Sequence, residues 1–144
     1  MNLGTSIPYT TGITGISFAT SWLTLQLDRP FGLPSLSGSI TTTIGLLLLG
    51  LAFVLRVWAM ETFYRHKLKV LWMGIQNRLV RDGPFRFSRN PLYVASVAMF
   101  IGSALVLGSP MALVLAVASI AIWQYFIVAV EEPSLRQYFG HDYN

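Results

Sequence analysis

ITTTIGLLLLGLAFVLRVWAM, residues 40–60, is an apolar stretch with one charged residue, Arg56. Three further apolar runs accompany it, at Thr11–Leu27, Pro91–Leu107 and Met111–Val130. Hydrophobic residues make up 53% of the 144-residue chain and charged residues only 11%, whereas soluble domains carry about 25% charge. Backbone hydrogen bonding inside lipid permits only helices or closed barrels. The sequence therefore predicts an all-α integral membrane protein with about four transmembrane helices, formed by a single domain over residues 1–144.

The connections between these runs differ in length. Thr11–Leu27 has 17 residues and would span about 26 Å, which is marginal for a hydrocarbon core of roughly 30 Å. Asp28–Gly38 is rich in Pro, Gly and Ser and predicts a loop. Gly108-Ser109-Pro110 predicts a tight turn, and with it a C-terminal helical hairpin. Arg56, near the end of its run, is expected to reach toward the membrane interface.

Charge predicts the topology. Seven of the ten Lys and Arg residues lie in Glu61–Asn90, and the positive-inside rule places that segment in the cytosol. With four spans both termini would be cytosolic, so Glu61–Asn90 and the tail Glu131–Asn144 would meet at one membrane face. The apolar runs argue against a nucleic-acid binder despite the net charge of +4. The N-terminus lacks the basic region of a cleaved signal peptide, and the absence of cysteine excludes disulfides and thiolate chemistry.

The first candidate site is GPFRFSRNPLY, residues 83–93. Asn90 suits the N-cap of the third helix and Pro91 its first position. The helix would then present free N–H groups and the positive end of its dipole beside Arg86 and Arg89, an arrangement that binds anions. The alternative is an ordinary helix start whose interfacial arginines contact lipid phosphate.

The second candidate site is Glu131-Glu132, which follows the fourth run. Acids at a helix C-terminus are unfavourable by about 0.3–1 kcal/mol each, so a cation should compensate them. That cation could be an arginine (Arg86, Arg89 or Arg136) or part of a bound ligand. The two sites together would suit a zwitterionic ligand with an additional positive centre.

The two motifs resemble those of the isoprenylcysteine carboxyl methyltransferase and phospholipid methyltransferase superfamily. The family pattern, L-V-x-x-G-P-Y-R-x-x-R-[HN]-P-x-Y followed by E-E-x-x-L-x-x-x-F-G-x-x-Y, is matched from Leu79 to Tyr93 and from Glu131 to Tyr143, and the resemblance covers about residues 40–144. It implies a membrane methyltransferase with S-adenosyl-L-methionine as cofactor, a cytosolic cofactor pocket and a lipophilic or amphipathic small molecule as methyl acceptor. The implied cofactor-binding residues are Asn77, Arg78, Leu79, Val80, Phe85, Asn90, Pro91, Leu92, Tyr93 and Glu131. Arg89 and Glu132 are the candidate catalytic residues.

The sequence departs from the family pattern at three places. Phe85 replaces a frequent Tyr. Ile127 stands where the eukaryotic prenylcysteine enzymes carry a substrate-binding Arg, which argues against a prenylcysteine carboxylate as acceptor. The chain ends just after Tyr143, where relatives usually continue, so a missing lid and a truncated sequence both stay open.

Two other functions compete with methyl transfer. One is an NADPH-dependent membrane reductase of related fold, against which the short chain argues. The other is a non-enzymatic scaffold or lipid-binding protein. No metal site is expected, because His66 and His141 lack metal-ligand spacing. Gly12 and Gly15 are expected to serve helix packing. The oligomeric state is not predicted.

Overall fold

The computed structural model describes residues 3–66, 80, 82–88, 90–126 and 129. Its elements are α1 (Leu3–Asp28), α2 (Ser39–Arg65), the 3₁₀ helix η1 (Gly83–Arg86), α3 (Pro91–Leu107) and α4 (Pro110–Phe126). Within these residues the protein contains no strand, which confirms the all-helical prediction. Of the described helices, α2 alone is both long enough and apolar enough to cross a membrane, and α3 and α4 are apolar but shorter.

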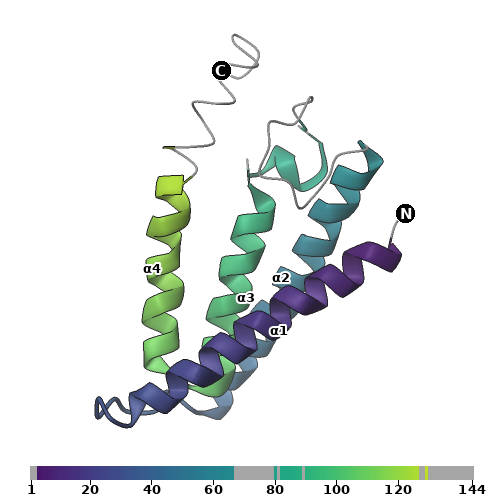
Figure 1. Cartoon of the computed structure of the whole chain (residues 1–144). Coiled ribbons are helices and arrows are strands. Elements are labelled where there is room, and N and C mark those ends of the chain that lie inside the picture. The colour runs from purple at the N-terminus through teal and green to yellow at the C-terminus, as the bar shows by residue number, and fades with distance from the viewer. Residues whose placement is uncertain (1–2, 67–79, 81, 89, 127–128, 130–144) are drawn as a thin grey trace.

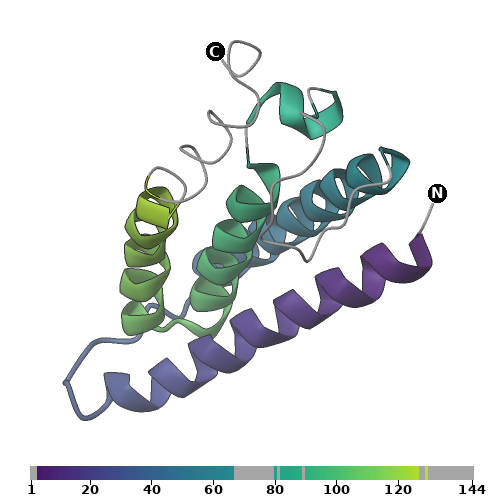
Figure 2. The ribbon, with the colours of Figure 1, turned by 45° about the horizontal axis from the view of Figure 1, so that its top comes forward.

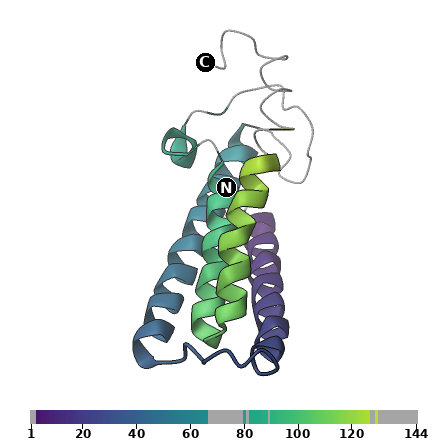
Figure 3. The same ribbon diagram turned by 90° about the vertical axis from the view of Figure 1, so that its left-hand side faces the viewer.

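The four α-helices share two ends (Figure 1). One end, called the η1 end here, is where α2 ends, η1 lies and α3 begins. The opposite end, called the loop end, holds the connection between α1 and α2 and the turn between α3 and α4 (Figure 3). At the loop end the Leu36 N–H donates to the Gly108 carbonyl at 2.9 Å. Helices α2 and α3 form the principal packing pair, and α1 runs obliquely across the others (Figure 2).

The helix boundaries agree with the prediction where local signals are strong. Helix α3 spans Pro91–Leu107 as predicted, and Gly108 ends it with φ +68°. Helix α4 begins at Pro110, one residue earlier than expected. Helix α2 continues to Arg65, beyond the predicted end at Met60. The predicted end of the fourth run, except Ala129, and the tail Glu131–Asn144 lie outside the described residues.

Helix α1 begins at Leu3, eight residues before the predicted Thr11, and contains Pro8. Its inward face is polar, with buried residues at spacings of three, four or seven: Ser6, Thr10, Ser17, Ser21, Thr24 and Asp28. Most of its large apolar side chains are exposed, such as Ile16 at 62%, while Ile13 and Phe18 are partly buried against the core. Small and polar residues at helix contacts and apolar ones outside are typical of helices surrounded by hydrocarbon. The predicted apolar run, Thr11–Leu27, therefore reflects the exposed apolar residues of α1. The prediction left out the first turns of the helix, which begins at Leu3.

The closest approach of α2 to α3 occurs at two glycines. A Cβ on Gly45 would lie 2.8 Å from the Gly102 carbonyl oxygen, and one on Gly102 would lie 3.0 Å from the Gly45 carbonyl oxygen. The expectation for Gly12 and Gly15 is wrong, because a Cβ on either would meet no atom within 4 Å. Those two glycines sit on the open side of α1, and the packing role belongs to Gly45 and Gly102.

Asp28 connects the end of α1 to the start of α4. Its carboxylate is 4% exposed, and Oδ1 accepts the Met111 N–H at 3.0 Å. It therefore acts as a cap supplied by a different helix. Asp28→Ala should lower the free energy of unfolding by about 1–2 kcal/mol, as loss of a helix cap does, and Asp28→Asn should cost less because it keeps an acceptor oxygen.

The loss can be measured by thermal unfolding, followed by circular dichroism in a fixed detergent. The exposed neighbour Arg29 provides the control substitution Arg29→Ala. Equal melting temperatures for Asp28→Ala and Arg29→Ala would contradict the assigned role.

Candidate functional site

The start of α3 carries the central part of the first motif. Asn90 occupies the N-cap position with φ −135° and ψ 66°, and its side chain makes no capping hydrogen bond. Its own N–H donates to the Ser88 hydroxyl oxygen at 3.3 Å. The predicted capping role of the Asn90 side chain is therefore wrong, because this backbone conformation lies outside the extended region that favours capping. Pro91 does hold the first helical position, fully buried.

The 3₁₀ helix η1 is held against the last turns of α2. The rings of Phe63 and Phe85 pack with centroids 4.6 Å apart and planes tilted by 41°. Gly83 has φ +58°, and a Cβ there would lie 2.7 Å from the Thr62 hydroxyl oxygen. Phe85, one of the implied cofactor residues, thus packs against α2, and this contact fixes the segment that leads into α3.

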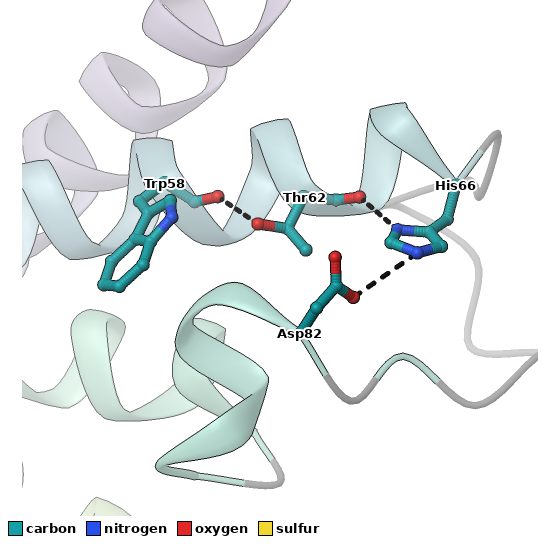
Figure 4. Close-up of polar contacts among 4 residues, drawn as sticks. All are labelled: Trp58, Thr62, His66 and Asp82. Atoms are coloured by element: carbon teal, nitrogen blue, oxygen red, sulfur yellow. Dashed lines mark hydrogen bonds and ion pairs between the residues drawn. The ribbon is translucent and has the colours of Figure 1, made fainter.

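A chain of polar contacts reinforces this junction (Figure 4). The Thr62 hydroxyl donates to the Trp58 carbonyl at 2.9 Å. His66 Nδ1 lies 2.9 Å from the Thr62 carbonyl oxygen, and Nε2 lies 3.3 Å from Asp82 Oδ1. Both ring nitrogens therefore lie within contact distance of oxygen atoms. His66 thus connects the end of α2 to the residue that precedes η1.

A cavity of about 450 Å³ lies among the helices, with most of its walls supplied by α1 and α3. It runs from Leu92 and Tyr93, at the start of α3, to Phe100 two turns further along that helix. Helix α1 supplies the facing wall, including Tyr9 and Ile16. This volume is within the usual range of ligand pockets, about 300–1,000 Å³. Two residues of the implied cofactor set, Leu92 and Tyr93, therefore also line this cavity.

Arg56 supplies a cation to this cavity from α2. Its Nη1 donates to the Leu92 carbonyl at 3.1 Å and to the Ser96 hydroxyl oxygen at 2.5 Å. The Ser96 hydroxyl in turn donates to the Leu92 carbonyl at 2.8 Å. Helix α2 continues nine residues beyond Arg56 to Arg65, so Arg56 lies further from the end of its helix than the sequence predicts. Its expected reach toward the membrane interface stays a prediction. Its position as the one charge inside an apolar run was the signal that could have marked it as a site residue.

Glu61 is a second ionisable group that the sequence analysis did not select. It is 6% exposed, and its Oε1 accepts the Ser6 hydroxyl at 2.6 Å. The contact joins α1 to α2 near the η1 end. In the sequence Glu61 looks like the start of the basic connecting segment, and only the fold shows that it is buried.

The candidate residues fall into three groups. Pro91, Leu92 and Tyr93 lie together at the start of α3, with Asn90 directly before them. Val80 and Phe85 are partly buried, and Arg86 is exposed. The remaining candidates, together with Ile127, lie outside the described residues: Asn77, Arg78, Leu79, Arg89, Glu131 and Glu132. Helix α4 does run back toward the η1 end (Figure 1), and its last described helical residue, Phe126, precedes Glu131 by five positions.

Comparison with known proteins gives a family match. Residues 40–142 match the family described as phospholipid methyltransferase. Two rice proteins, from Oryza sativa subsp. indica and subsp. japonica, are each named probable protein-S-isoprenylcysteine O-methyltransferase and are 28% identical to this chain over 105 residues. The aligned part is 69% of this chain and 53% of each relative, so the chain spans about half the length of these curated relatives. No solved structure matches.

Proposed function

The chain belongs to the phospholipid methyltransferase family, and we propose that it is a membrane-embedded, S-adenosylmethionine-dependent methyltransferase with a lipophilic or amphipathic acceptor. The observation that carries the proposal is the position of Leu92 and Tyr93. They belong to the motif at the start of α3 and also line the cavity between the helices. A cofactor bound at the motif would therefore adjoin a chamber suited to an apolar acceptor.

The residues at the start of α3 fit the carboxylate of this cofactor. Pro91 has no N–H, and the N–H groups of Tyr93 and Val94 donate to the Asn90 carbonyl, at 3.1 and 3.2 Å. The helix dipole favours an anion at this end. Because the Asn90 side chain makes no capping bond, its amide can be directed to a ligand. We assign the methionine portion to Asn90–Tyr93 and a cationic portion to Glu131.

The chemistry itself requires little from the protein beyond positioning. The bound cofactor supplies a methyl group on a sulfonium sulfur, which a nucleophile displaces in line. The protein residues would align the acceptor with that methyl group and exclude water, two effects that lower the barrier of such transfers. Glu132, or a water molecule, could accept a proton where the acceptor carries one. Arg89 would stabilise negative charge beside the start of α3.

The proposal also includes an orientation. The segment between α2 and α3 holds most of the basic residues, and the positive-inside rule assigns it to the cytosol. The η1 end would then face the cytosol, where the charged cofactor is available. The acceptor would enter from the bilayer, between helices of a multi-pass bundle.

Calorimetry on the purified protein tests this function. Wild-type protein should bind S-adenosylmethionine and not NADPH. Asn90→Ala and Glu131→Ala should each weaken binding by at least about tenfold, because each removes a hydrogen bond to a charged ligand. Phe87→Ala is the matched control and should bind like wild type, because this side chain lies within the motif, is 82% exposed and is not among the implied cofactor-binding residues.

The alternative results identify the rival functions. Binding of NADPH instead would indicate the membrane reductase, and binding of neither molecule would indicate a scaffold or lipid-binding protein. Wild-type affinity in both Asn90→Ala and Glu131→Ala would show that the site assignment is wrong. Circular dichroism of each variant should match wild type, so that a loss of binding is not a loss of fold.

A further inference from the structure

We propose that the cavity between α1 and α3 binds a single-chain lipophilic anion, with its oxyanion held by the Arg56 guanidinium and its hydrocarbon chain along α3. The identification of this ligand as the methyl acceptor rests on the proposed function. The binding itself rests on the donors of Arg56 and on the shape and lining of the cavity.

Arg56 has guanidinium N–H groups that donate to no described residue. A guanidinium carries five N–H groups, and both hydrogen bonds that Arg56 makes to described residues come from Nη1. Its Nε is buried and has no hydrogen-bond partner among the described residues. An unsatisfied buried donor on a charged group is costly, so a ligand oxygen that accepts from this edge would be favourable.

The charge of Arg56 is also uncompensated within the described part of the chain. The other residues that line the cavity are uncharged, and the ion pair between the described residues His66 and Asp82 does not involve Arg56. A guanidinium in apolar surroundings needs a counter-ion or hydrogen-bond acceptors. The two acceptors it has, the Leu92 carbonyl and the Ser96 hydroxyl, are neutral. A carboxylate or phosphate would supply the missing negative charge and could bind a guanidinium through two oxygens.

The rest of the cavity is suited to a hydrocarbon chain. Beyond Arg56 its walls are largely apolar, with Ile13 and Ile16 from α1 facing Val97 and Phe100 from α3. Ile16 lines the cavity and is 62% exposed, so the cavity is open to the surface at this residue. The polar end at Arg56 and Leu92 lies toward the η1 end, and the apolar part lies deeper. This is the order of head group and chain in an amphiphile that enters from the bilayer.

The volume of the cavity favours a single-chain ligand over a two-chain ligand. About 450 Å³ accommodates one long hydrocarbon chain with a small head group. A two-chain phospholipid would have to leave one chain outside. The oxyanion would lie beside Leu92 and Tyr93, next to the assigned cofactor site, which is the position required of a methyl acceptor.

Photolabelling in nanodiscs of pure phosphatidylcholine tests the inference. The probes are palmitate and hexadecanol, each with a diazirine near the chain end, which differ only in head-group charge. Wild type should be labelled on α1 and α3 by the carboxylate at least about tenfold more than by the alcohol. Arg56→Gln should lose this preference and keep the alcohol labelling, and Arg56→Lys should retain part of it. Arg29→Gln, an exposed arginine at the loop end, should behave like wild type.

Each other outcome has a definite meaning. Equal labelling of wild type by the two probes overturns the proposal, and this comparison needs no variant to fold. Loss of palmitate labelling when phosphatidylglycerol is added to the nanodisc overturns the single-chain assignment in favour of a bilayer lipid. Competition by lysophosphatidate supports the proposal and extends it to phosphates. S-adenosylmethionine calorimetry on the same samples separates the two claims: carboxylate preference without cofactor binding would refute the methyltransferase and leave the anion site intact.

Discussion

Gly83→Ala is expected to weaken S-adenosylmethionine binding by at least about tenfold while the four α-helices remain folded. Gly83 has φ +58°, and a Cβ there would lie 2.7 Å from the Thr62 hydroxyl oxygen. Thr62 is buried and its hydroxyl is committed to the Trp58 carbonyl, so it cannot turn away without losing that bond. The alanine would therefore push η1 away from α2 (Figure 4). The displacement would carry Asn90 and the start of α3 out of position, and such misplacement has large effects on a binding site.

Gly32→Ala separates backbone strain from the steric clash. Gly32 has φ +63°, nearly the same conformation, but a Cβ there meets no atom within 4 Å. Both variants should lose about 1–2 kcal/mol of stability from the left-handed backbone, and only Gly83→Ala should lose cofactor affinity. Calorimetry and thermal unfolding on both proteins measure the two effects. Equal affinities in the two variants would show that the position of η1 does not control the site.

Gly45→Ala is expected to give the largest loss of stability, about 1–3 kcal/mol, which is typical of overpacking a closely packed interior. The new Cβ would lie 2.8 Å from the Gly102 carbonyl oxygen and 2.9 Å from the Val106 backbone nitrogen. Backbone atoms within a helix cannot give way as a flexible side chain can. Helices α2 and α3 would therefore have to separate along their principal contact.

Gly50→Ala provides the matched control on the same helix. A Cβ on Gly50 would meet no atom within 4 Å, so this substitution should be neutral or stabilise by up to about 1 kcal/mol through helix propensity. Thermal unfolding in one detergent gives the comparison. A Gly45→Ala protein as stable as Gly50→Ala would mean that α2 and α3 do not pack as closely as described.

The parts of the fold that the sequence predicted are those with local signals. Pro91 and Gly108 mark the two ends of α3, and each acts through its own backbone conformation. The polar face of α1 gave no such signal, because the side-chain partners of Ser6, Thr10 and Ser21 lie far away in the sequence. Ser21 and Ser103, for example, share a hydrogen bond of 2.8 Å. Periodicity of apolar residues cannot reveal a contact of this kind.

The candidate site also contains one part that the sequence predicted from local signals and one part formed by contacts between distant residues. The motif around Asn90 is contiguous and could be recognised, whereas the contact of Arg56 with Leu92 spans 36 positions and that of Glu61 with Ser6 spans 55. The capping prediction for Asn90 failed because residue type alone does not fix ψ at 66°. The sequence identified the motif residues at the start of α3, and the structure added the cavity and the cation Arg56 that lines it.

The polar inward face of α1 has a consequence for how the helices assemble during synthesis of the protein. In hydrocarbon, its hydroxyl-bearing face needs hydrogen-bond partners, and those partners, such as Glu61 and Ser103, belong to helices that the ribosome makes later. We therefore expect α1, although synthesised before α2 and α3, to settle into place after them. Since α1 also forms one wall of the cavity, a nascent or partly assembled chain would lack that wall of the proposed ligand site.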